Sequence, residues 1–234
     1  MEDFRVEIAG EPLRLLPERA VFWAACSTLL IADTHWGKAA TFRAAAIPVP
    51  GGTTQADLDR LSQAIERTCA TRVIILGDLL HSREGRSAET FELVSRWRDR
   101  HSRLEIELIQ GNHDLHAGLP LADWRMRIFR PPVSEGPFVW RHDPEIDALP
   151  VDPLEENAKI TGQERFALAG HIHPTVVLRG AARQSLRLPC FHLRNKVLVL
   201  PAFSSFAGGA NIRPAEGDRV FPVSESSVFE CDYC

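Results

Sequence analysis

Three polar residues of different kinds follow one another in the sequence: Asn112, His113 and Asp114. They come soon after an apolar run that ends at Ile109, and Gly111 stands immediately before them. Asn112 offers a neutral oxygen, His113 an imidazole nitrogen, and Asp114 a carboxylate that can orient one of the other two. Core packing gives no reason for such a dense polar group, so we expect these residues to form one wall of a functional site.

Four other groups of polar residues show the same arrangement, since each follows a short apolar stretch. Binding sites in open α/β sheets form at the carboxyl ends of strands, so this recurrence predicts one composite site. The candidate metal ligands in these groups are Asp33, His35, Asp78, Asn112, His142, His171 and His173.

These seven candidates offer oxygen or imidazole nitrogen, and none is a thiolate. Such a set suits Mn, Fe, Co, Ni or Zn, and of these we expect Mn²⁺. Seven ligands exceed what one tetrahedral zinc needs. With one bridging carboxylate they can supply four contacts to each of two ions. Two ions about 3.5–4 Å apart form the clamp used for in-line displacement at phosphorus.

The first half of the chain alternates strand and helix patterns, which predicts an α/β arrangement. Hairpin strands are expected in residues 1–26. The hydrophobic spacing predicts one helix capped by Thr53–Thr54 and a second that starts at Ser87. Continuous apolar runs predict strands buried on both faces at residues 27–32, 72–76 and 104–109.

The second half is broken by prolines and predicts short strands at residues 138–141, 166–169, 176–178, 196–200 and 228–230. The acidic stretch 143–163 contains three prolines and is expected to be an exposed loop. His171 and His173 alternate on a segment expected to be extended, which would direct both side chains to one face. No linker is evident, so we expect a single domain of residues 1–234 that includes the N-terminal strands.

The composition resembles that of an ordinary globular protein and argues against some functional classes. No run of about 18 uncharged apolar residues is present, so no membrane span is expected. The N-terminus lacks a secretory pattern, so the cytoplasm is the expected location. The net charge of −4 shows no overall excess of positive charge of the kind that nucleic-acid-binding proteins carry. The five scattered cysteines do not suggest a disulfide framework, and the pair Cys231 and Cys234 is expected to lie in a frayed tail.

The polar motifs occur in the order found in calcineurin-like metallophosphoesterases, which this sequence resembles. They are Asp33-x-His35, Gly77-Asp78, Gly111-Asn112-His113-Asp114, His142 and Gly170-His171-x-His173. Longer stretches resemble the ligase-associated DNA damage response endonuclease family PdeM, at residues 28–38, 47–50, 170–174, 188–191 and 200–209. The resemblance implies a four-layer αββα sandwich, with two mixed sheets flanked by helices and a site at the carboxyl ends of strands.

The resemblance also implies a role for each motif residue. The metal ligands divide into two sets with a bridging carboxylate: Asp33, His35 and His173 for one ion, Asn112, His142 and His171 for the other, and Asp78 between them. His113 would contact the scissile phosphate and stabilise charge or protonate the leaving oxygen, and Asp114 would orient His113. A hydroxide between the metals would be the nucleophile. The acidic stretch after His142 leaves His116 as an alternative ligand.

Residues that could contact a substrate around this centre are less sharply defined. Lys38, Arg43 and His81 are candidates for contacts near the scissile phosphate, with a solvated surface as the alternative. The aromatic and basic residues of 124–130 could form a nucleic-acid surface. A helix with one buried aromatic side chain is the preferred explanation for that stretch.

The expected function is that of a bacterial two-metal-dependent phosphodiesterase, a DNA endonuclease of DNA repair. DNA is implied by the resemblance, as is an association with the repair ligase, helicase and exonuclease encoded beside members of the family. A homodimer paired through the N-terminal hairpins is a further expectation. The alternatives are a small-molecule phosphomonoesterase, a cyclic-nucleotide phosphodiesterase, or an interaction scaffold without catalysis.

Overall fold

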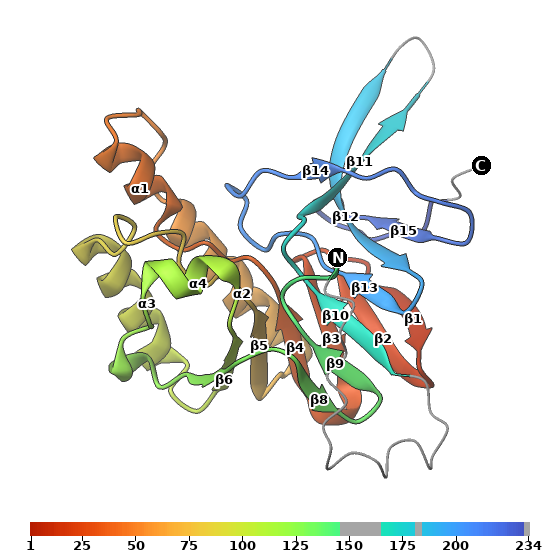
Figure 1. The fold of residues 1–234 in the computed structure, drawn as a ribbon, viewed down its shortest axis with the longest axis horizontal. Coiled ribbons are helices and arrows are strands. Elements are labelled where there is room, and N and C mark those ends of the chain that lie inside the picture. The colour runs from red at the N-terminus through yellow and green to blue at the C-terminus, as the bar shows by residue number, and fades with distance from the viewer. Residues whose placement is uncertain (146–164, 181–183, 232–234) are drawn as a thin grey trace.

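Two mixed β-sheets stack face to face at the centre of the computed structural model, which describes residues 1–145, 165–180 and 184–231 (Figure 1). The first sheet has the strand order β1-β2-β3-β4-β5-β6-β7. Its strands are β1 (Phe4–Ile8), β2 (Glu11–Leu16), β3 (Ala20–Trp23), β4 (Thr28–Ile31), β5 (Arg72–Leu76), β6 (Glu105–Ile109) and β7 (Arg127–Phe129). β1 to β4 pair in antiparallel fashion, and β4 to β7 are parallel.

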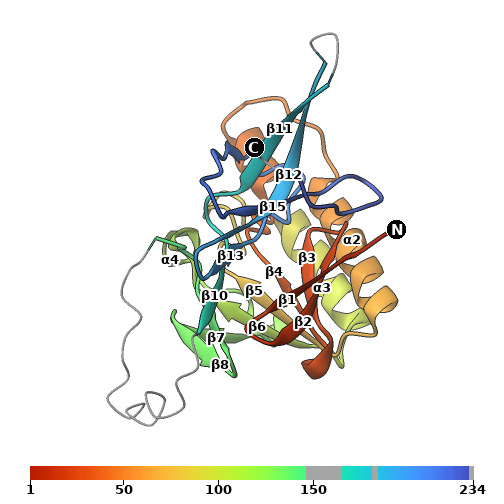
Figure 2. The same ribbon diagram turned by 90° about the vertical axis from the view of Figure 1, so that its right-hand side faces the viewer.

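The second sheet comes from the second half of the chain and has the order β14-β11-β12-β13-β10-β9-β8, with β15 paired to β12. Its strands are β8 (Val133–Glu135), β9 (Phe138–Trp140), β10 (Phe166–Ala169), β11 (Pro174–Arg179), β12 (Ser185–Arg194), β13 (Val197–Val199), β14 (Ala210–Asn211) and β15 (Arg219–Pro222). β11 and β12 form a long hairpin that extends away from the stacked sheets in both views (Figures 1 and 2).

In the described part of the chain, the helices come from the first half and lie on one side of the first sheet (Figure 1). They are α1 (Lys38–Ala44), α2 (Thr53–Thr68), α3 (Ala88–Arg100) and α4 (Asn112–Ala117), with short 3-10 turns at Ala24–Cys26 and Ala122–Trp124. The buried stripe of α2 includes Leu58 and Leu61, and it packs with Trp97 of α3 against the sheet. A second apolar cluster fills the space between the two sheets.

The expected two mixed sheets with flanking helices are confirmed, and the helices in the described ranges all accompany the first sheet. The N-terminal strands pair into that sheet in successive antiparallel hairpins. None of the described helices is both long and apolar enough to span a membrane. The expected acidic loop falls, from residue 146 onward, outside the described residues, and so does Cys234.

Two local predictions are wrong. The cap of α2 is Gly52, whose φ of 82° suits glycine, while Thr54 instead accepts a hydrogen bond from the Gly37 N–H at 3.2 Å. Residues 228–230 form no strand, since Val228 makes only an isolated bridge with Val223. The place beside β12 is taken by β15, which the sequence reasoning did not predict.

Candidate metal centre

Five strands from both sheets end at one edge, and each is followed by candidate ligands. β4, β5 and β6 are parallel neighbours in the first sheet, and β9 and β10 are parallel neighbours in the second. The loops after them are tied by backbone hydrogen bonds: Asp33 N–H donates to Gly77 O at 3.2 Å, and Gly170 N–H donates to His142 O at 3.0 Å. The strand-end rule therefore assembles one site from segments far apart in the chain.

One group of potential ligands consists of Asp33, His35 and His173. His35 Nε2 lies 3.3 Å from His173 Nε2, and His173 Nε2 lies 3.4 Å from Asp33 Oδ1. Asp33 Oδ1 and His35 Nδ1 are buried without a hydrogen-bond partner among the described residues. Buried polar atoms are normally paired, so the unpaired Asp33 oxygen beside two imidazoles fits a cation.

A second group consists of Asp78, His142 and His171, with Asn112 beside it. His142 Nε2 lies 3.4 Å from Asp78 Oδ2, 3.1 Å from His171 Nδ1 and 2.9 Å from Asn112 Oδ1. His142 Nδ1 donates to Leu76 O at 2.9 Å, which leaves Nε2 facing the group. The structure thus places His142, rather than the exposed His116, among these ligands.

Asp78 lies between the two groups. Its Oδ2 atom is 3.4 Å from His142 Nε2 and 3.9 Å from His35 Nε2. The other oxygen, Oδ1, accepts a hydrogen bond from the His113 N–H at 2.9 Å. A carboxylate in this position can reach both ligand groups, as a bridging ligand must.

The backbone at five of these residues adopts a left-handed conformation. φ values between 43° and 73° occur at Asp33, His35, Asp78, His171 and His173. The expected extended segment at His171 and His173 is therefore wrong, because β11 begins only at Pro174. The sharp bend sends the two imidazoles into different ligand groups, whereas an extended chain would have directed them to one face.

Glycines allow the loops to approach one another closely. A Cβ atom on Gly111 would lie 2.4 Å from Asp78 Oδ1, and one on Gly170 would lie 2.5 Å from Asp33 Oδ2. Both distances are too short for a side chain, so the motif glycines make room for the two carboxylates.

Electrostatic coupling within the site shifts the pKa of several groups. For His142, burial alone would lower the pKa, but the hydrogen bond to Asp78 and the charge of Asp33 outweigh it and raise the pKa to about 9. For Asp78, burial opposes ionisation, but His142 outweighs it and the pKa falls to about 2. Burial lowers the pKa of His35 to about 2, so this imidazole is neutral.

In the loop after β6, Asp114 bonds to backbone N–H groups, whereas a backbone carbonyl holds the ring of His113. Asp114 accepts hydrogen bonds from the N–H groups of Gly111 at 2.8 Å and of Asp78 and Leu79 at 2.9 Å each. The bond that orients the ring of His113 joins its Nδ1 to His81 O at 2.7 Å, where the resemblance had implied Asp114. Asp114 thus holds the site loops together, and a carbonyl oxygen orients the imidazole.

Of the three residues expected near a substrate, one lies beside the ligand groups and two are bonded to other parts of the chain. His81 lies beside the site: its ring centroid is 5.0 Å from that of His113, and burial lowers its pKa to about 4. Lys38 is half-buried and donates to Ala207 O at 3.0 Å. Arg43 is paired with Glu89 at 2.9 Å on the surface. His81 is therefore nearer the expected chemistry than the two cationic candidates.

Sequence reasoning named Arg130 only within the stretch 124–130, as part of a possible nucleic-acid surface, and did not group it with the residues at strand ends. β7 is parallel to β6, and its Phe129 O accepts a hydrogen bond from the Gln110 N–H at 2.9 Å, so Arg130 follows a strand end at the same edge. The strand-end rule could have found it. Trp124 of the same stretch is fully buried, as expected, but the expected helix is wrong: a 3-10 turn ends at Trp124, and Arg127–Phe129 form strand β7.

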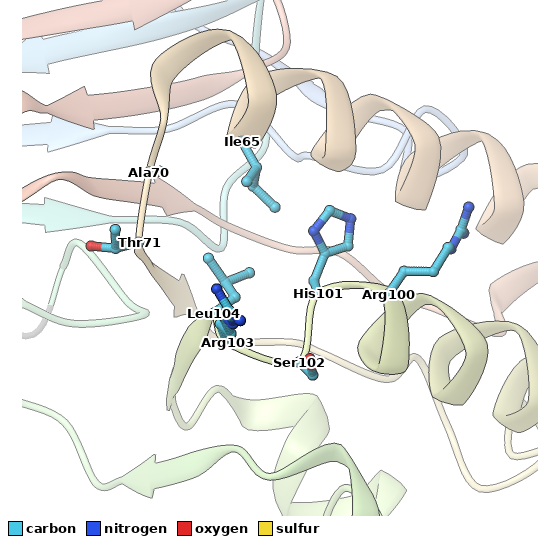
Figure 3. A pocket seen from close by; sticks show the side chains of 8 residues that line it. All are labelled: Ile65, Ala70, Thr71, Arg100, His101, Ser102, Arg103 and Leu104. Carbon is cyan, nitrogen blue, oxygen red and sulfur yellow. The ribbon is translucent and has the colours of Figure 1, made fainter.

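A pocket of about 330 Å³ lies away from this edge, where α2 and α3 end and β5 and β6 begin (Figure 3). Its lining includes Arg100, His101 and Arg103, and His101 Nε2 lies 2.9 Å from Ser62 Oγ. It contains none of the grouped metal-ligand candidates of the described residues. Among the described residues, the grouped ligand candidates therefore gather at the strand-end edge and not at this pocket.

Comparison with known proteins gives a structural relative over the whole length. The chain is similar to the Pseudomonas putida nuclease MPE, with 36% sequence identity and a TM-score of 0.81 over 98% of this chain and 100% of that chain. It is also similar to YfcE, a phosphoesterase from E. coli, at 16% identity and a TM-score of 0.43, over 87% of this chain and 97% of that chain. No protein-family model matches, and no curated protein matches.

Proposed function

The chain belongs to the metallophosphoesterase superfamily and is a metal-dependent phosphoesterase, and from this premise we propose that it is a two-metal DNA endonuclease of DNA repair. The observation that carries the proposal is the pair of ligand groups with Asp78 between them. Similarity to a nuclease over the full length supports a nucleic-acid diester as the substrate. DNA is inferred from the motifs that resemble the ligase-associated endonucleases.

The residues present fit two divalent cations. Asp33, His35 and His173 would hold one ion, and His142, His171 and Asn112 the other, with Asp78 shared. Oxygen and imidazole ligands suit Mn²⁺, which we propose as the ion. When bound, such ions polarise the phosphoryl oxygens and lower the pKa of bound water.

In this proposal, His113 moves a proton at the leaving oxygen. The carbonyl of His81 can only accept a hydrogen bond, so the hydrogen lies on His113 Nδ1. This leaves Nε2 as the atom that carries a proton in the charged form and can donate it to the leaving oxygen. Asp78 fixes the same residue through its backbone N–H. The imidazole is therefore held at both its ring and its main chain.

The experiment compares four substrates in the presence of Mn²⁺: bis-p-nitrophenyl phosphate, a phosphomonoester, single-stranded DNA and duplex DNA. Wild type, Asp78→Ala and His113→Ala are assayed side by side. We expect diester and DNA cleavage by wild type and its loss in Asp78→Ala. Equal activity of wild type and Asp78→Ala would refute the two-metal proposal, and cleavage of the monoester alone would identify a phosphomonoesterase.

The proposed partners follow from the same resemblance. We propose a functional association with a repair ligase, a helicase and an exonuclease, and self-association through the N-terminal hairpins. Sedimentation of the purified chain tests the second proposal, since a monomer over the micromolar range would contradict it.

A further inference from the structure

A cavity of about 390 Å³ opens directly beside the second ligand group. Asn112, His142 and His171 belong to its lining, so any molecule held at the second group would border on it. The lining extends beyond these three residues to others that the proposed catalytic chemistry does not use. The cavity is large enough for a single aromatic ring system.

The rest of the cavity's lining combines apolar surface with one cation. Leu115 on α4 is 68% exposed, although large apolar side chains usually avoid water. The exposed Pro131 adds to the same lining, and Arg130 brings a guanidinium group. A flat guanidinium stacks on aromatic faces, and apolar side chains pack against them.

We propose that this cavity binds the nucleobase next to the scissile phosphate. The inference rests on the proposed function, because it assumes that a nucleic acid lies at the metal centre. A base attached one sugar away from the cleaved phosphate would reach the cavity while the phosphate stays at the ligand groups. To enter, the base must leave its stack with its neighbours.

The remaining lining favours a base over a second phosphate. Asp143 and Gln110 are also lining residues, and a carboxylate and an amide suit the donor and acceptor edges of a base. A phosphate in the same place would meet the negative charge of Asp143 and the apolar surface of Leu115. The cavity is therefore a specificity subsite rather than an anchor for the backbone.

The test is a double-mutant cycle. It removes the base from the DNA and, separately, the side chain of a lining residue from the protein. Labelled oligonucleotides carry one abasic nucleotide at each position around a cleavage site, and wild type is compared with Leu115→Ser and Arg130→Gln. We expect the loss of one base flanking the cut to lower kcat/KM by roughly tenfold or more. On DNA that lacks this base, the two variants should match wild type, because the interaction is already absent.

Matched controls come from exposed residues that do not line this cavity. Leu119→Ser and Arg103→Gln should cleave like wild type on every oligonucleotide. Cleavage that is insensitive to the abasic position, or equal losses for the variants with and without the base, would overturn the inference while leaving the proposed function intact. A wild-type protein that cleaves no DNA at all would refute the proposed function and the inference with it.

Discussion

His142 connects the two sheets at the scale of a single side chain. Its Nδ1 donates to Leu76 O of the first sheet, and its Nε2 faces Asp78 and Asn112 of the loops after β5 and β6. The residue itself follows β9 of the second sheet. Its protonation state therefore governs whether the second ligand group can accept a cation, because a metal ligand must be deprotonated.

Proton release on metal binding is the first prediction. With a pKa raised to about 9, His142 carries a proton at pH 7.5 before metal binds. A cation must displace that proton, so apparent affinity should rise as the pH rises toward about 9. Calorimetry at pH 7.5 in buffers of different ionisation enthalpy should show the release of about one proton for each ion that binds at the second ligand group. Mn²⁺ binding to wild type without proton release would contradict the prediction.

The carboxylate of Asp114 gives the second prediction. Asp114→Asn keeps the shape but replaces one acceptor oxygen with a donor, so at least one of the three N–H groups that the carboxylate now satisfies loses its acceptor and faces an N–H group instead. We expect a loss of about 1–3 kcal/mol in the free energy of unfolding, together with lower activity. Urea denaturation measures the first effect. Asp123→Asn, at an exposed aspartate on the surface, is the matched control and should change neither quantity.

At the scale of elements, the site depends on loops that approach closer than side chains allow. Strands β4, β5 and β6 bring Asp33, Asp78 and Asn112 to one edge. Gly111 packs against Asp78 and Gly170 against Asp33, and these glycines determine how closely the loops approach one another. Loop spacing is therefore as important to the site as the identity of the ligands.

Replacing one such glycine gives the third prediction. In Gly111→Ala, the new methyl group would lie 2.4 Å from Asp78 Oδ1 and 2.7 Å from Asp78 N, so the carboxylate must move. A displacement of this order can reduce the rate about 100-fold. The control is Gly51→Ala, where nothing lies within 4 Å of the added atom. Steady-state cleavage of the diester measures both, and similar rates for the two variants would refute this account.

The strands and the ligand clusters were predictable because both rest on local patterns. Apolar runs followed by polar residues identified β4, β5, β6, β9 and β10, and parallel pairing then brought their ends together. The left-handed backbone at His171 and His173 was not predictable, since these residue types favour no such conformation strongly. The hydrogen-bond donors to Asp114 could not be predicted either, because Asp78 and Leu79 are remote from it in sequence.

For the whole molecule, the candidate ligand groups draw residues from both sheets. Asp33 and His35 follow β4 of the first sheet, whereas His173 follows β10 of the second. A cation held by such a group binds the folded chain and not the unfolded chain. Metal binding should therefore stabilise the packing of one sheet on the other.

Thermal stabilisation by metal is the fourth prediction. At a free Mn²⁺ concentration about 100 times the Kd, the folded state should gain roughly 2.7 kcal/mol, which corresponds to a rise in Tm of about 5–10 °C for a chain of this size. Addition of EDTA should reverse the shift. Differential scanning calorimetry measures it, and Asp78→Ala should show a smaller shift. A Tm that does not respond to Mn²⁺ would contradict a centre built across both sheets.

The distribution of ligands along the chain also bears on synthesis. His35 and His173 touch across 138 residues of sequence, and the ligands of the first sheet all precede those of the second. A ribosome therefore releases Asp33, His35, Asp78 and Asn112 long before the three later histidines exist. A nascent chain would hold only part of the proposed centre, so the proposed cleavage activity would wait until the strand before the last candidate ligands had been made and had docked.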